Sequence, residues 1–406
     1  MDSGVRRFVI IGNGAAGTTA AEVLRKQEPG CSITLLTDEP YPLYNRVALP
    51  RMLKGEVPAD KVFLRTPQDL AAARIDLRTG TRAAAVDARG RSVHLEDGRE
   101  LPYDALLVAT GGRPRPLPVP GGDAPNCLQF QFYDETVALI EAMGRSRRAV
   151  AVGGSFISYE LAEGFRARGL EVVWLIRGPR WLRRILDEEG GALVDAIAAA
   201  HGVEVIHGEE VASVTVRDGL AVGVMTTGGR RIDADLVGSG LGLDLNTAVV
   251  AGTAARLGTG ILTDGCLRTA EPGIFAAGDV AEYEDEITGS HHVMGTWDNA
   301  LAHGRVAALN MLGGSTPYVD VPTYQSGLFD TIISVLGVTP ETLPDAASVV
   351  RCDMGARTYR KLFFNQGRLV GAVMIGSIRG KKKLMDLIRQ RAVFRGASER
   401  QALLQG

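Results

Sequence analysis

The sequence has few cysteines and no cysteine pair. Its 406 residues contain only the scattered cysteines Cys31, Cys127, Cys266 and Cys352. Because none of them forms a C-x-x-C motif, the spacing argues against a disulfide framework and against a zinc site. The adjacent His291 and His292 have no further ligands at suitable spacing, so we expect no metal site. A reducing compartment fits best, and we expect a cytoplasmic protein.

Long apolar runs and an excess of one charge are also missing. No segment approaches the roughly 18 uninterrupted apolar residues that a membrane-spanning helix needs. The apolar run near the N-terminus leads into a glycine-rich turn instead of a cleavage site. The formal net charge is -2, which gives no overall attraction to nucleic acid or to an anionic membrane. We therefore expect neither a nucleic-acid partner nor a membrane span.

Glycine is abundant, with 50 residues, and one glycine-rich turn follows the first apolar run. Arg7–Ile11 is continuously apolar after its first residue, which is typical of a buried parallel strand. The turn Gly12–Gly17 reads G-x-G-x-x-G and is followed by a helical segment, then by a second strand, Ser32–Leu36. The first glycine permits the turn, the second lets the backbone approach a pyrophosphate, and the third lets helix and strand pack. This βαβ unit predicts a dinucleotide site.

The same pattern recurs after Arg148. Ala149–Val152 predicts a strand, Tyr159–Arg168 a helix and Glu171–Ile176 the next strand, so a second nucleotide is expected. In the turn between them, Ser155 and Ser158 replace two glycines. Ser155 adds only a hydroxymethyl group, which can point away or donate to phosphate, and Ser158 should push helix and sheet slightly apart or fill a small gap. We expect nicotinamide nucleotide binding, and a degenerate site that only packs is the alternative.

The end of the second unit's Glu171–Ile176 strand bears on the choice of coenzyme. Arg177 stands where an NADH site usually has an acid for the 2'-hydroxyl. Arg180, Arg183 and Arg184 follow it, and an arginine suits a 2'-phosphate. The pattern favours NADPH over NADH, with a solvated basic loop as the alternative.

The rest of the chain supports an α/β fold with two Rossmann-like dinucleotide-binding domains and a C-terminal α+β interface domain. Thr296 is the expected N-cap of a helix from Trp297 to about Leu312. Strands are expected at 331–336, 360–364 and 369–375, with a hairpin turn at 365–367 and a helix at 381–391. We expect a first dinucleotide-binding domain in residues 1–115 and 241–315, a second in 116–240 and a C-terminal domain in 316–406.

Four motifs, in this order, resemble the FAD-dependent pyridine nucleotide-disulfide oxidoreductases, the family of glutathione reductase. They are GNGAAG at 12–17, ATG at 109–111, GGSFIS with Glu160, and GIFAAGDVA at 273–281. DEPYPLYNRVAL at 38–49 is most similar to the branch of ferredoxin and rubredoxin reductases and the FAD domain of the nitrite reductase large subunit. Residues 40–46 contain no cysteine, where the redox-disulfide members carry theirs. The resemblance therefore implies FAD without protein thiol chemistry. It implies that residues 1–115 and 241–315 form the FAD-binding domain, 116–240 the NAD(P)-binding domain and 316–406 the interface domain.

The resemblance also implies roles for single residues. Asp38 and Arg46 would contact FAD, and Asp279 would bind its ribityl chain. The N-terminus of the helix at Thr296 would lie at the flavin edge where negative charge develops, and its N–H groups would stabilise that charge. The FAD-binding residues expected are Gly12, Gly14, Ala15, Ala16, Gly17, Asp38, Glu39, Arg46, Ala83, Ala109, Thr110, Gly111, Gly278, Asp279, Thr296 and Trp297. Trp297 would shield the ring or simply be a core aromatic residue.

At the coenzyme, the resemblance places Glu160 by the nicotinamide and the flavin N5 atom. Arg51 stands where ferredoxin reductases often carry a lysine, and a pair of Glu160 with Arg51 would tune charge there or be a plain salt bridge. The segment at 176–183 resembles the NADPH loop of glutathione reductase, although the nitrite reductase branch can lack the acid and still use NADH. The NAD(P)-binding residues expected are Gly153, Gly154, Ser155, Phe156, Ile157, Glu160, Arg177 and Gly240.

The expected function is electron transfer through FAD, between NAD(P)H and an iron-sulfur or rubredoxin-type protein. The chain would act alone or as the flavin subunit of a larger complex, and a homodimer stays open. The basic residues near the C-terminus would steer an acidic partner or form a soluble surface; they are Arg379, Lys381, Lys382, Lys383, Arg389, Arg391 and Arg395. The alternatives are an NAD(P)H oxidase or quinone reductase, and a non-catalytic flavoprotein resembling apoptosis-inducing factor.

Overall fold

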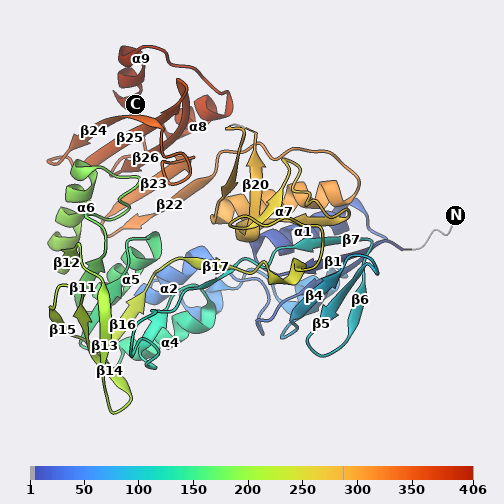
Figure 1. The fold of residues 1–406 in the computed structure, drawn as a ribbon, viewed down its shortest axis with the longest axis horizontal. Coiled ribbons are helices and arrows are strands. Elements are labelled where there is room, and N and C mark those ends of the chain that lie inside the picture. The colour runs from blue at the N-terminus through green and yellow to red at the C-terminus, as the bar shows by residue number, and fades with distance from the viewer. Residues whose placement is uncertain (1–4, 287, 406) are drawn as a thin grey trace. The chain divides into compact units, whose positions relative to one another are not determined.

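A computed structural model describes residues 5–286 and 288–405. The chain forms two compact units, drawn in Figure 1. The first unit holds the chain up to Asn45, Phe63–Arg113 and Leu245–Thr323, and the second holds Arg46–Val62, Pro114–Asp244 and the chain from Tyr324 onward. The chain passes between the units at several points, two of which lie in β8 (Gly112–Pro114) and β17 (Leu243–Leu245). The four-part division into domains expected above stays a prediction.

A parallel five-stranded sheet forms the centre of the first unit, in the order β19-β7-β1-β2-β3. Its strands are β1 (Arg7–Ile11), β2 (Ser32–Leu36), β3 (Asp76–Arg78), β7 (Ala105–Val108) and β19 (Ile274–Ala276). Phe8 and Ile10 pack into one core cluster, whereas Val9 and Ile11 pack into another on the opposite face. Both faces of β1 are buried, which explains why its sequence is apolar without alternation.

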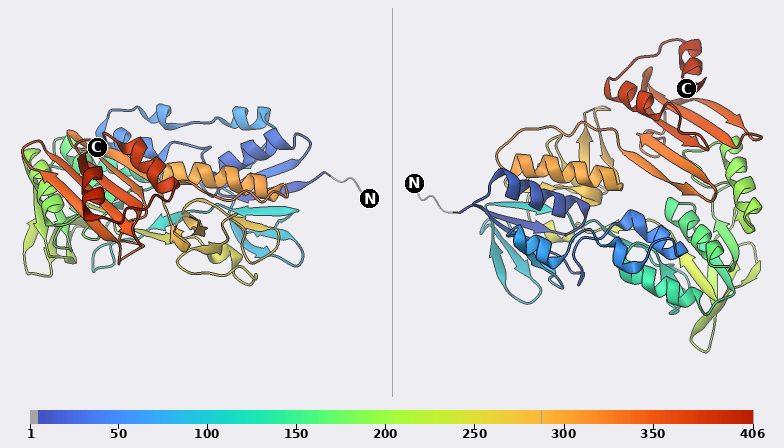
Figure 2. Two further views of the ribbon diagram at one scale, coloured as in Figure 1. Left: turned by 90° about the horizontal axis from the view of Figure 1, so that it is seen from above. Right: turned by 180° about the vertical axis from the view of Figure 1, so that it is seen from behind.

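Helices α1 (Ala15–Gln27) and α7 (Trp297–Met311) run side by side in the first unit (Figures 1 and 2). Gly304 of α7 permits this approach, since a Cβ there would lie 2.3 Å from the carbonyl oxygen of Ala16. An antiparallel sheet, a mixed sheet and a short helix complete the unit. They are β4 (Ala83–Asp87), β5 (Ser92–Leu95) and β6 (Glu100–Pro102); β18 (Ile261–Thr263), β20 (Ala281–Asp285) and β21 (Ser290–Val293); and α3 (Pro67–Ala72). In the mixed sheet, β18 and β20 pair in parallel.

The second unit contains another parallel five-stranded sheet, in the order β12-β11-β10-β16-β9. Its strands are β9 (Cys127–Gln129), β10 (Arg148–Val152), β11 (Glu171–Ile176), β12 (Val203–His207) and β16 (Leu236–Ser239). The accompanying elements are α2 (Leu49–Lys54), α4 (Tyr133–Met143), α5 (Phe156–Ala167), α6 (Glu188–Ala200), β13 (Val211–Arg217), β14 (Leu220–Thr226) and β15 (Arg231–Asp233). Helix α5 begins at Phe156, earlier than the expected Tyr159, because Ser155 is its N-cap.

The C-terminal part of the second unit is an antiparallel sheet in the order β22-β23-β26-β25-β24, with α8 packed against β23 and β26 (Figure 2). Its elements are β22 (Thr323–Leu328), β23 (Thr331–Gly337), β24 (Ala347–Asp353), β25 (Thr358–Asn365), β26 (Arg368–Ile375), α8 (Lys381–Arg389) and α9 (Ala397–Ala402). Gln366 and Gly367 both have positive φ, as the predicted hairpin turn requires. Helix α8 ends before the expected Arg391, since that residue is left-handed with φ 54°.

The sequence did not predict the two edge strands of this sheet. Strand β24 is largely exposed, and β22 carries polar residues and a glycine instead of an apolar run. A strand at a sheet edge needs fewer apolar side chains, so its pattern is weak. Among the helices of the described ranges, none is long and apolar enough to cross a membrane.

Candidate functional site

Two glycines of the first turn have no room for a side chain, whereas the remaining one faces open space. A Cβ on Gly12, whose φ is +108°, would lie 2.2 Å from the carbonyl oxygen of Ala109, and a Cβ on Gly17 would lie 1.8 Å from that of Gly12. A Cβ on Gly14 would meet no atom within 4 Å. The first and third glycines are therefore required by the protein itself, and the second leaves free space at the N-terminus of α1, where a phosphate group fits.

Two acids follow β2, as expected, and both already have partners in the protein. The Asp38 carboxylate accepts a hydrogen bond from the Arg113 guanidinium at 2.6 Å, and the Glu39 carboxylate accepts one from the Tyr44 hydroxyl at 2.6 Å. Both interactions join residues of the first unit. Sequence reasoning missed Arg113 and Tyr44, because contacts between separate segments leave no local pattern.

Asp279 lies beside the segment that leads into α7. It belongs to a single 3-10 turn, Gly278–Val280, and a Cβ on Gly295 would be 3.6 Å from its carboxylate. Thr296 caps α7 as predicted, since its hydroxyl accepts a hydrogen bond from the Asn299 N–H at 3.4 Å. The first unit thus brings an acid and a helix N-terminus close together, and both are groups that the resemblance assigns to FAD.

Arg46 does not belong to the same unit as the other expected FAD residues. It starts the 3-10 turn Arg46–Ala48 in the second unit, and its guanidinium lies over the Phe132 ring, 4.8 Å from the centroid. Ala83 and Trp297 are partly buried and pack against core clusters of the first unit. The packing of Trp297 agrees with the core-aromatic alternative, and its contact with FAD stays a prediction.

The two serines of the second turn are satisfied by protein groups. The Ser155 hydroxyl donates to the Gly240 carbonyl at 2.8 Å and accepts from the Ser158 N–H at 3.4 Å. The Ser158 hydroxyl is buried and donates to the Ser155 carbonyl at 2.7 Å. Gly153 keeps the turn with φ +128°, since a Cβ there would lie 2.5 Å from the Gly240 oxygen. The serines therefore stabilise the turn in place of glycine and leave the N-terminus of α5 formed.

A tryptophan that the sequence reasoning did not select closes the loop after β11 onto this turn. Trp181 is fully buried, and its indole N–H donates to the Ser155 carbonyl at 2.9 Å. Its ring contacts Phe156 edge-on at 5.6 Å between centroids. The arginines of this loop suggest a charged binding site, whereas Trp181 is the residue that holds the loop against the turn.

Arg177 is the exposed arginine at the end of β11, with a side-chain exposure of 67%, and its Nε lies 3.9 Å from the carboxylate of Glu210. Arg180 instead donates to the Leu186 carbonyl at 2.9 Å and serves the local structure. Arg177 therefore lies beside an acid, and its contact with the coenzyme stays a prediction. Glu210 could not be identified beforehand because it follows a different strand.

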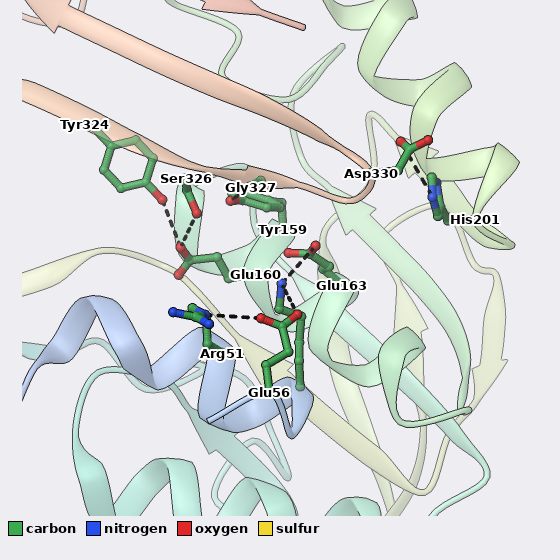
Figure 3. Close-up of polar contacts among 11 residues, drawn as sticks. Arg51, Glu56, Tyr159, Glu160, Glu163, His201, Tyr324, Ser326, Gly327 and Asp330 are labelled. Atoms are coloured by element: carbon green, nitrogen blue, oxygen red, sulfur yellow. Dashed lines mark hydrogen bonds and ion pairs between the residues drawn. The ribbon is translucent and has the colours of Figure 1, made fainter. Parts of the chain in front are cut away.

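Glu160 is buried on α5 and faces β22, as Figure 3 shows. Its carboxylate accepts hydrogen bonds from the hydroxyls of Tyr324 at 2.9 Å and Ser326 at 3.4 Å. Burial raises the pKa of Glu160 to about 7, because the loss of water around the carboxylate outweighs the hydrogen bonds from Tyr324 and Ser326 and the charge of Lys54. The same strand is tied to α5 a second time, since the Tyr159 hydroxyl donates to the Gly327 carbonyl.

The expected pair of Glu160 with Arg51 is wrong. Arg51 lies on α2 with its side chain 61% exposed and pairs with Glu56 at 3.3 Å (Figure 3). No ion pair within residues 5–286 and 288–405 joins it to Glu160. The buried cation is Lys54, which contacts Glu163 at 3.3 Å and Glu56 at 3.1 Å. The short helix α2 turns Arg51 outward and Lys54 inward, and the sequence alone could not distinguish these directions.

The comparisons with known proteins agree with this arrangement. Residues 6–304 match the sequence model of the pyridine nucleotide-disulphide oxidoreductases, and residues 331–392 match that of the rubredoxin NAD+ reductase C-terminal domain. Rhodocoxin reductase of Rhodococcus erythropolis is 31% identical over 92% of this chain and 87% of its own length. Nitrite reductase [NAD(P)H] of Bacillus subtilis (strain 168) is 27% identical over 96% of this chain, which spans 48% of that protein.

A solved structure has the same fold. The covalent putidaredoxin reductase–putidaredoxin complex contains a chain that matches with a TM-score of 0.89 and 25% identity, over 95% of this chain and 93% of that one. The family match covers both glycine-rich turns, and the window for redox cysteines contains none. This chain therefore belongs to the pyridine nucleotide-disulphide oxidoreductase family and is an FAD-dependent NAD(P)H oxidoreductase of the branch without redox cysteines.

Proposed function

We propose that this chain transfers hydride between NAD(P)H and FAD and single electrons between FAD and an iron-sulfur or rubredoxin-type protein. The observation that carries the proposal is the pair of glycine-rich turns, one in each compact unit, combined with a cysteine-free segment at residues 40–46. FAD, when bound, supplies the redox chemistry, since it accepts a hydride and releases electrons. The chain would act alone or as the flavin subunit of a larger complex.

The residues proposed for FAD act by holding and orienting it. Gly14 leaves room for the pyrophosphate at the N-terminus of α1, and Gly12 and Gly17 maintain that turn. Asp279 is proposed to accept a hydrogen bond from the ribityl chain. The N–H groups at the start of α7, after Thr296, supply positive electrostatic potential without a titrating side chain. The other expected FAD contacts, including Asp38 and Glu39, stay predictions.

The N-terminus of α5 is proposed to bind the pyrophosphate of the coenzyme. Gly153 and Gly154 form the turn, and Ser155 caps the helix without occupying its other N–H groups. NADPH use stays a prediction that rests on Arg177, and Glu210 beside it favours a 2'-hydroxyl instead. Replacement of Arg177 by alanine should therefore raise the dissociation constant of NADPH about tenfold, equivalent to about 1.4 kcal/mol, and leave that of NADH nearly unchanged.

The proposed electron acceptor is an acidic iron-sulfur or rubredoxin-type protein. Helix α8 buries Leu384 and Ile388 and exposes Lys382 and Lys383. An exposed basic surface raises the rate of encounter with an acidic partner at low ionic strength. The match of residues 331–392 to a rubredoxin reductase domain supports the same class of partner. A cytoplasmic location stays a prediction from the unpaired cysteines.

Anaerobic mixing of the yellow protein with NADH and with NADPH tests the proposal. We expect fast bleaching of the flavin absorbance by at least one coenzyme, followed by recovery when a ferredoxin or a rubredoxin is added. Recovery with oxygen or a quinone and no gain from either protein would indicate an oxidase or quinone reductase. Slow bleaching by both coenzymes would indicate a non-catalytic flavoprotein. A colourless protein that cannot be reconstituted with FAD would contradict the proposal as a whole.

A further inference from the structure

His303 is a buried residue of α7 that none of the roles above uses. Its side chain has no exposed surface and packs against two tyrosine rings of the first unit, which also contact each other. The ring of Tyr283 lies 4.7 Å from it at 83°, and that of Tyr318 lies 4.4 Å from it at 89°, measured between centroids. A histidine packed against aromatic rings has few polar groups to contact, so its hydrogen bond to a backbone N–H indicates what the ring does in this position.

That hydrogen bond determines the protonation of the ring. The Gly278 N–H donates to His303 Nδ1 at 3.3 Å, so Nδ1 carries no proton and the neutral ring must carry its proton on Nε2. Nε2 has no hydrogen-bond partner among the residues that the structure describes. Burial lowers the pKa of His303 to about 3, since a charged ring would lose its hydration. The ring is therefore a permanent acceptor for Gly278 near neutral pH.

Gly278 lies at a point where the backbone has little freedom. Its φ is +74°, and a Cβ there would be 3.2 Å from the Cβ of Ala16, in the first turn of α1. The next residue is Asp279, and the preceding Ala277 N–H donates to the Val108 carbonyl at 3.0 Å. The bond from Gly278 to His303 thus fixes the peptide plane between a strand end and Asp279. Without an acceptor, this buried N–H would be unpaired, which costs free energy.

We propose that His303 is a positioning residue for FAD, which acts by holding the Gly278 N–H and so presents Asp279 to the cofactor beside the first turn of α1. The inference rests on the proposed FAD site. His303 itself does not touch the reacting atoms in this proposal. Its contribution is to fix the backbone conformation at Gly278, the residue before Asp279, whose side chain is proposed to contact FAD.

A matched pair of variants tests the acceptor directly. His303→Gln keeps an oxygen that can accept from Gly278, whereas His303→Met has a similar length without a strong acceptor. We expect the dissociation constant of FAD for the apoprotein to rise about tenfold in H303M and to stay within about twofold in H303Q. The visible circular dichroism of the bound flavin should change in H303M alone. Tyr283→Phe is the control, since it removes a nearby buried hydroxyl that has no partner in the described chain.

Several outcomes would overturn the proposal. An unchanged FAD affinity and spectrum in H303M, or an equal loss in H303M and H303Q, would show that the acceptor atom is not what matters. Nitrogen-15 NMR of the wild-type histidines provides a test that needs no variant. We expect His303 as a neutral Nε2–H tautomer that does not titrate between pH 5 and pH 9, and a protonated Nδ1 would contradict the argument. Failure of the wild-type protein to bind FAD would instead refute the proposed function.

Discussion

Replacement of Glu160 by glutamine should make the stability of the second unit less dependent on pH. Glutamine keeps an oxygen that can accept from Tyr324 and Ser326, but it cannot ionise. The variant therefore removes the cost of placing a negative charge in a buried position and retains the contact between α5 and β22. Both hydrogen bonds end on the same carboxylate oxygen, Oε1, so the single amide oxygen of glutamine can accept both (Figure 3).

The magnitude follows from the pKa of Glu160. Burial raises it from 4.5 to about 7, and the difference corresponds to about 3 kcal/mol. Because the folded protein binds this proton more tightly than the unfolded chain, the wild-type free energy of unfolding falls as pH rises from about 4.5 to about 7. Above that pH, the contribution is constant. The advantage of E160Q should thus be small at pH 5 and reach about 3 kcal/mol at pH 8.

Urea unfolding of both proteins at pH 5 and pH 8 measures this difference. Trp174 and Trp181 are buried in the second unit, so tryptophan fluorescence reports on the relevant region. Glu171→Gln serves as the control, because the Glu171 side chain is 79% exposed and its removal should leave the pH dependence unchanged. Parallel curves for E160Q and the wild type between pH 5 and pH 8 would refute the reasoning.

Two further predictions concern packing. Gly14→Ala should leave the thermal unfolding of the apoprotein unchanged, since the added Cβ meets open space, but it should weaken the binding of FAD at least about tenfold because that Cβ occupies the phosphate position. Gly17→Ala should destabilise the apoprotein itself, since its Cβ would lie 1.8 Å from the Gly12 carbonyl oxygen. Normal FAD affinity in G14A, measured by fluorescence titration, would contradict this. Lys54→Met should cost about 1–3 kcal/mol at pH 8, because it leaves the buried Glu163 without its cation, and less at pH 5, where burial has raised the pKa of Glu163 and it can protonate. Urea unfolding at the two pH values checks this, and equal losses would argue against it.

Much of the framework could be predicted because its causes are local. The apolar strands β1, β10 and β11, the two glycine turns and the N-cap at Thr296 each depend on residues that are neighbours in the chain. A turn needs glycine because of its own φ and the atoms of the next strand, and a cap needs a hydroxyl beside its own helix. These features were sufficient to indicate the family, the cofactors and the class of reaction.

The partners of the charged residues depended on tertiary structure. Glu160 meets Tyr324 and Ser326 instead of Arg51, and Arg177 lies near Glu210. The expected pair of Glu160 with Arg51 was wrong because the partner of a side chain is set by the groups that the fold brings together from distant segments, and the role of Arg177 stays a prediction.

The sequence by itself determined that two nucleotide-binding turns exist, since a glycine's steric freedom is a property of the residue and its neighbours. Only the tertiary structure decided that a buried carboxyl faces two hydroxyls of a strand with a weak pattern, and that a histidine on α7 accepts a hydrogen bond from Gly278. Burial and hydrogen bonding across the chain set the charge of both groups, and neither quantity is a property of sequence neighbours.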